Sequence, residues 1–137
     1  MEMEALAARR PATEYPSRLV ESGERLILDP LPLLAVLGAR ACRGVDSGTL
    51  AADFHASFAW ATAAMVRRLA ARNGLQTVAL AGGVFQNGRL LESVEGRLVR
   101  AGFRVLAPRA LPPNDGAISY GQAAVAAARL AGETGSA

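Results

Sequence analysis

The sequence predicts an α/β fold, and three observations lead to this prediction. Short apolar runs without polar alternation, typical of strands covered on both faces, alternate with longer segments of helical apolar periodicity. A length of 137 residues suits one domain, and 51% apolar residues are enough for a core without disulfides. We therefore expect one domain over residues 18–131, between loose segments at 1–17 and 132–137.

The first half predicts one strand and two helices. Residues 24–28 (ERLIL) form the strand, which Asp29-Pro30 ends. A helical stripe with two glycines in its course begins at Leu31, and the longest helix covers residues 50–72. In this long helix the apolar residues recur every three to four positions; they are Leu50, Phe54, Phe58, Ala61, Met65 and Leu69. Its candidate N-caps are Asp46, Ser47 and Thr49, and Asn73-Gly74 ends it.

The second half predicts a strand, a helix and a strand in about 30 residues, which is the crossover unit of a parallel sheet. The strands are residues 77–81 (TVALA) and 103–106 (FRVL), and the helix between them is 87–100. A polar loop over residues 110–115 precedes a last helix at 118–130. We expect Asp115, with Gly116 behind it, to be presented at the carboxyl edge of the sheet, where open α/β sheets bind their ligands.

Composition excludes several classes of function. No apolar run approaches the roughly 20 residues of a membrane span, and the N-terminus lacks the apolar region of a signal peptide. We therefore expect a cytoplasmic protein, which the single cysteine also favours. The net charge is +3, but the arginines are scattered among acids and only 5% of residues are aromatic, so we expect no nucleic-acid partner.

Three features are candidates for chemistry. Gly82 and Gly83 follow a buried strand and precede a helix, so backbone there can approach an anion such as a phosphate near the N–H groups of the helix start. Asn87 either caps that helix or contacts a ribose or phosphate oxygen. Asp115, after two prolines, either caps the last helix or holds a metal ion.

The remaining candidates favour structural roles. His55 is the only histidine, and a lone imidazole does not build a metal site, so we interpret it as a structural or rim residue. Cys42 is interpreted as a small buried apolar residue because no activating neighbour beyond two arginines is evident.

Taken together, these motifs resemble one family. The segments that carry the resemblance are DFHASFA, LAGGVFQNGRLLESVEGRL and GFRVLAPRALPPNDGAISYGQAAVAAARL. They are similar to the C-terminal end of the hydrogenase-maturation carbamoyltransferases, within the wider carbamoyltransferase and tRNA-threonylcarbamoylation family. The resemblance covers about residues 15–130. It implies the C-terminal half of an actin-like ATPase (RNase H-like) domain, with a small mixed or parallel sheet and flanking helices.

The resemblance also implies a mechanism. Family members form a carbamoyl adenylate from carbamoyl phosphate and ATP, and pass the carbamoyl group to a partner, here a cysteine thiol of a second hydrogenase-maturation protein. Gly82, Gly83 and Asn87 then correspond to nucleotide-binding residues, and Asp115 corresponds to a ligand of a divalent metal ion. The family pattern departs at Gly88, where an arginine is usual, and at Ala117, where a glycine is usual. No residue is assigned a catalytic role.

The paired-histidine metal motif and the first phosphate loop of the family belong to an upstream half that this sequence does not contain. We therefore expect no turnover by this chain alone, and a partner that carries the upstream half. One alternative is a noncatalytic domain that self-associates or binds a maturation protein through an apolar patch on the helix at 50–72. Another is a fragment that O-carbamoylates a small metabolite.

Overall fold

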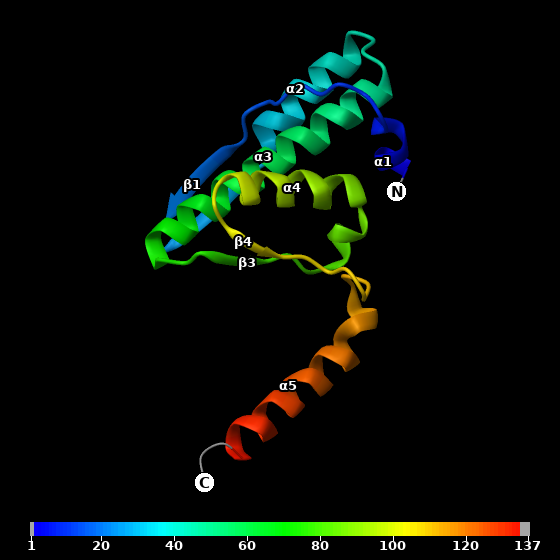
Figure 1. The fold of residues 1–137 in the computed structure, drawn as a ribbon. Coiled ribbons are helices and arrows are strands. Elements are labelled where there is room, and N and C mark those ends of the chain that lie inside the picture. Colours follow the sequence, from blue (N-terminus) through cyan, green and yellow to red (C-terminus); the bar gives the residue numbers. More distant parts are fainter. Residues whose placement is uncertain (1, 135–137) are drawn as a thin grey trace.

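The computed structural model describes residues 2–134. The helices are α1 (Glu2–Ala7), α2 (Leu31–Cys42), α3 (Ser47–Asn73), α4 (Gly88–Arg100) and α5 (Ile118–Thr134). The strands are β1 (Arg18–Ser22), β2 (Arg25–Asp29), β3 (Thr77–Ala79) and β4 (Arg104–Leu106), with 3₁₀ turns η1 (Gly83–Gln86) and η2 (Asp115–Ala117). α4 lies between α3 and the β3–β4 pair, whereas α5 extends away from this body (Figure 1). The expected mixed α/β architecture is confirmed.

The long helix has the ends that its sequence predicts. Asp46 is the N-cap of α3, and its carboxylate accepts hydrogen bonds from the backbone N–H groups of Gly48 (3.1 Å) and Thr49 (3.2 Å). Gly74 ends the helix in the left-handed conformation, with φ +64°. The buried face differs in part from the expected stripe, because small residues such as Ala52 and Ala59 (both 0% exposed) carry it. These alanines allow close approach of the neighbouring helices.

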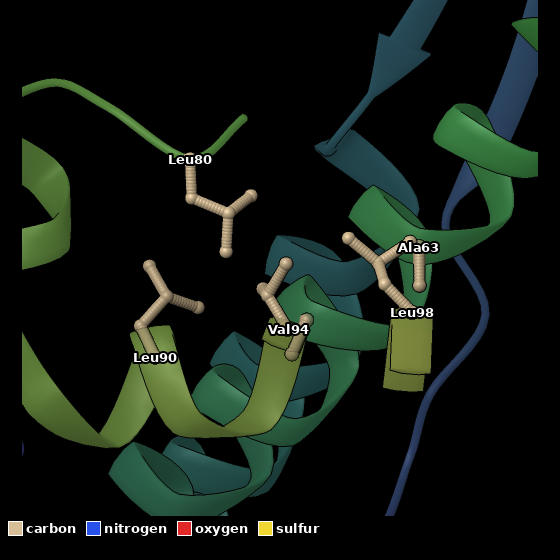
Figure 2. Packing of buried hydrophobic residues seen from close by; sticks show 6 residues of the cluster. Ala63, Leu80, Leu90, Val94 and Leu98 are labelled. Atoms are coloured by element: carbon tan, nitrogen blue, oxygen red, sulfur yellow. The ribbon is translucent and has the colours of Figure 1, made fainter. Parts of the chain in front are cut away.

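The crossover unit is also confirmed. β3 and β4 pair in parallel, with Val78 opposite Val105. Asn87 caps α4, and the inward residues of this helix pack against α3 and against Leu80, in the segment just after β3 (Figure 2). The buried cluster consists of Ala59, Ala63, Leu80, Leu90, Val94 and Leu98. This core holds the carboxyl ends of β3 and β4 in place.

One strand was not expected from the sequence. β1 pairs with β2 in an antiparallel hairpin, with Ser22 opposite Arg25 and the turn at Gly23, whose φ is +58°. Only Leu19 and Val20 of β1 are apolar, so its periodicity is weak. Pairing with β2 therefore forms this strand, and β1 and β2 make a second sheet separate from β3 and β4.

Residues 2–17 are not loose, contrary to the expectation for the N-terminal segment, whose first residue lies outside the described residues. Ala7 of α1 is fully buried against Ala51 and Ala52 of α3. The backbone N–H of Thr13 donates to the carboxylate of Asp53 (2.6 Å), which is 1% exposed and also paired with Arg40. Such long-range contacts tie the segment to α3, and local composition does not reveal them.

The C-terminal end also differs from expectation. Residues 132–134 belong to α5, whereas 135–137 of the expected tail lie outside the described residues. The long helix α3 packs against α1, α2, α4 and β2, so the apolar patch expected on it is limited to Trp60, its one exposed large apolar side chain (39%). Exposed apolar side chains lie instead on α5, including Ile118 (57%) and Tyr120 (65%). No helix within residues 2–134 has the length and apolar character to cross a membrane.

Candidate functional site

The turn after β3 is built for close approach of a ligand. Gly82 has φ +106° and ψ 156°, a conformation that is essentially restricted to glycine. Neither Gly82 nor Gly83 has a neighbouring atom within 4 Å of where a Cβ would lie, so the space around the turn is open. No other described residue accepts a hydrogen bond from the backbone N–H of Gly83 or Val84. These two donors remain available to an anion.

The loops that follow β3 and β4 meet in one groove, as the parallel pairing predicts. The backbone N–H of Gly82 donates to the carbonyl oxygen of Pro113 over 2.7 Å, which joins the two loops directly. A groove of about 800 Å³ is lined by both loops and by the first turn of α5. Gly82 and Asp115 both line it, whereas Gly83 and Asn87 do not. Two of the four predicted site residues thus share one surface.

The carboxylate of Asp115 does not cap the last helix, because it accepts no hydrogen bond from a described backbone N–H. The neighbouring Asn114 caps the preceding turn η2, where its side-chain oxygen accepts from the backbone N–H of Gly116 (3.0 Å). Asp115 is exposed, and it is the only carboxylate among the described residues that line the groove. Its oxygens are therefore free for a ligand, and the capping alternative is wrong.

Asn87 and His55, treated separately in the sequence, form one hydrogen-bonded unit. The Asn87 side-chain oxygen accepts from the backbone N–H of Leu90 (2.9 Å), so its amide nitrogen faces Nε2 of His55 (2.8 Å). Nδ1 of His55 lies 2.7 Å from the carbonyl oxygen of Ala51, which only accepts, so Nδ1 carries the proton and Nε2 accepts from Asn87. His55 is 3% exposed. Its role is structural: it orients the carboxamide of Asn87 and leaves one amide N–H of that group uncommitted.

The start of α4 is less open to an anion than the sequence suggested. A carboxylate oxygen of Glu4 accepts from the backbone N–H of Arg89 (3.1 Å), and Asn87 occupies the N–H of Leu90. Glu4 thus supplies the negative charge that a helix N-terminus favours. A phosphate group is therefore better served by the donors of Gly83 and Val84, one turn earlier.

A divalent cation fits this groove only with further ligands. Residues 2–134 contain no group of three or more histidine, cysteine, aspartate or glutamate side chains placed to hold a metal ion. A single carboxylate such as Asp115 suits Mg²⁺ when phosphate oxygens and water complete the coordination. The donor set thus fits a metal ion that arrives with a phosphorylated ligand.

Sequence reasoning missed several residues of the site. Pro113 contributes through its carbonyl oxygen and Glu4 through a contact with Arg89 across 85 positions, and neither has a local signal. Asp53 is a charged residue within an apolar helical stripe, and a buried carboxylate needs a hydrogen-bonding or charged partner. This position could therefore have indicated a long-range contact. Cys42 is exposed, so its interpretation as a buried residue is wrong.

Comparison with known proteins identifies the relationship. Residues 1–122 match a family described as the second subdomain of the Kae1-like domain of carbamoyltransferases. The chain is 42% identical to carbamoyltransferase HypF of Rhodobacter capsulatus over 75% of its own length and 13% of that protein. It is 41% identical to a HypF homolog of Cupriavidus necator over 74% of its length, which is 26% of that protein.

Solved structures agree with this relationship. Full-length HypF in its phosphate- and nucleotide-bound form superposes with a TM-score of 0.82 at 30% identity, over 91% of this chain and 16% of that one. HypF of T. kodakarensis shares the fold, with a TM-score of 0.73 at 24% identity over 96% of this chain and 17% of that one. The chain spans a small fraction of these relatives. It belongs to the HypF-type carbamoyltransferase family, as the second subdomain of the Kae1-like domain.

Proposed function

We propose that this chain forms one wall of a nucleotide- and metal-binding site in a carbamoyltransferase. The enzyme uses carbamoyl phosphate and ATP to carbamoylate a cysteine thiol of a partner in the maturation of nickel–iron hydrogenases. The observation that carries this proposal is the single groove lined by Gly82 and Asp115, joined by the hydrogen bond from Gly82 to Pro113. Membership of the carbamoyltransferase family supports the reaction and the acceptor.

Each residue has a distinct task in this proposal. The N–H groups of Gly83 and Val84 donate to phosphate oxygens of the nucleotide, because no other described residue takes them. Asp115 holds a divalent cation that offsets phosphate charge. Asn87, oriented by His55, keeps α4 in place and offers its second amide N–H to the nucleotide or carbamoyl adenylate.

The same geometry supports the expectation that this chain of 137 residues has no turnover by itself. A parallel pair normally lies within a sheet covered on both faces. Here Thr77, Ala79, Arg104 and Leu106 are exposed on the face opposite α4, and the groove has one carboxylate. We propose that a polypeptide carrying the other half of the domain covers this face and completes the site.

Titration with ATP and Mg²⁺ tests the binding proposal. Nuclear magnetic resonance of the labelled chain should show shifts at Gly82, Gly83 and Val84, with weak affinity because only one wall is present. Asp115→Asn should remove the Mg²⁺-dependent part of binding and leave the spectrum otherwise native. Shifts confined to another surface, or an unchanged Mg²⁺ dependence in Asp115→Asn, would contradict the proposal.

A second candidate is a noncatalytic self-associating domain, which the exposed α5 favours. Residues 118–128 carry no charge, and the whole run is exposed. Light scattering after size exclusion distinguishes the two functions. A stable homodimer that binds no ATP supports the interaction domain, whereas a monomer that binds Mg²⁺-ATP supports the carbamoyltransferase wall.

A further inference from the structure

A second depression lies between α3 and the C-terminal end of α4. Its volume is about 430 Å³, and it shares no lining residue with the groove of Gly82 and Asp115. It is lined by four large side chains, Trp60, Arg67, Arg97 and Arg100, and by three alanines, Ala63, Ala64 and Ala101. We call it the arginine groove.

Positive charge in the arginine groove is only partly neutralised. Arg97 pairs with Glu14, but within residues 2–134 neither Arg67 nor Arg100 forms an ion pair. Arg97 and Arg100 lie in the last turn of α4, where cations stabilise a helix. Arg67 lies six positions before the end of α3, beyond the reach of that effect. Helix stability therefore accounts for Arg97 and Arg100 but not for Arg67, the third guanidinium group around the depression.

The depression is part of a longer channel. Trp60, 39% exposed, also lines a smaller hollow with Glu14, Tyr15 and Pro16. At the other end, Ala64, Arg67 and Ala101 are shared with a hollow that continues to Leu75 and Phe103. From Trp60 to the end of α3 at Asn73 the channel follows this helix for roughly 20 Å, at about 1.5 Å per residue. This length matches roughly six residues of extended polypeptide.

We propose that the arginine groove binds an extended acidic segment of a partner polypeptide. Its carboxylates would pair with Arg67 and Arg100, in the planar two-pronged geometry that guanidinium groups favour. A proline or apolar side chain would pack on Trp60, and a second apolar side chain would reach Leu75. A peptide fits better than single-stranded nucleic acid, because the arginine groove offers one exposed indole instead of a row of stacking rings.

The only tryptophan of the chain lies in this groove, so its fluorescence reports binding directly. The probe is a tryptophan-free peptide of about eight residues with glutamates, a proline and a leucine. Its matched control carries glutamines in place of glutamates. The acidic peptide should shift Trp60 emission in a salt-sensitive way, and the glutamine peptide should not.

Variants locate the response. Arg67→Gln and Arg100→Gln should each weaken the acidic peptide at least about tenfold, since each removes a charge-assisted contact. Arg25→Gln, at an exposed position of β2 that does not line the channel, should bind like the parent chain, and circular dichroism should show all three variants folded. The proposal is overturned if the acidic peptide leaves Trp60 emission unchanged, or if the glutamine peptide binds the parent chain as tightly as the acidic peptide does. It is also overturned if Arg67→Gln and Arg100→Gln bind the acidic peptide as tightly as the parent chain, or if oligouridylate binds more tightly than the acidic peptide.

Discussion

The unit of Asn87 and His55 makes the sharpest prediction about stability. Asn87→Ala removes the N-cap of α4, which costs about 1 kcal/mol in the free energy of unfolding. The same substitution removes the hydrogen-bond donor of Nε2 of His55, a side chain that is only 3% exposed. Leaving this buried acceptor unpaired costs about 1–3 kcal/mol more. The expected total of about 2–4 kcal/mol is a large part of the stability of a small domain.

A second background separates the two contributions. In His55→Leu the buried acceptor is gone, so Asn87→Ala should then cost only the cap, about 1 kcal/mol. Asn87→Ser, which keeps a cap but does not reach His55, should fall between the parent chain and Asn87→Ala. Urea unfolding followed by far-UV circular dichroism measures all of these variants. Equal costs of Asn87→Ala in both backgrounds would show that the two side chains are not coupled, and would refute the reasoning.

Three further variants follow from the fold. Leu98→Ala should lower the free energy of unfolding by about 2–5 kcal/mol in urea titrations because Leu98 is fully buried, while the adjacent exposed Val99→Ala should change it by less than about 0.5 kcal/mol. Gly82→Ala should cost about 1–3 kcal/mol through its positive φ alone, and a cost near zero would mean that the turn relaxes. Hydrogen bonds from the Thr49 hydroxyl and backbone N–H, with the nearby Arg10 guanidinium, hold the pKa of Asp46 below its ordinary value of 3.8. This cap therefore stabilises the fold above pH 3.8 and is lost as the pH falls through the lowered pKa, so Asp46→Asn should flatten the acid limb of the unfolding curve.

The sequence predicted correctly those helices whose caps and buried faces depend on residues close together in the chain. Asp46 and Gly74 mark α3, and Leu90, Val94 and Leu98 mark the buried face of α4. The expected place of Asp115 at the carboxyl edge of the sheet agrees with the groove that it lines together with Gly82.

Long-range contacts explain what the sequence did not reveal. α1 and the segment after it are ordered by partners on α3, such as the Asp53 carboxylate that accepts from Thr13. The carboxylate of Glu4 accepts a hydrogen bond from the backbone N–H of Arg89, 85 positions away at the start of α4. No sequence pattern near Glu4 or Arg89 indicates this contact. The link between His55 and Asn87 joins two motifs 32 positions apart, so it needed the packing of α3 on α4 to become visible.

Carbamoyl-phosphate-dependent exchange between ATP and pyrophosphate tests the central claim most directly. The account predicts no exchange by this chain alone, and exchange when a polypeptide carrying the upstream half of the Kae1-like domain is added. That restored exchange should be lost with Asp115→Asn, which keeps the fold. Exchange by the chain alone, or restored exchange that is indifferent to Asp115→Asn, would contradict the claim that this chain supplies one wall of the site.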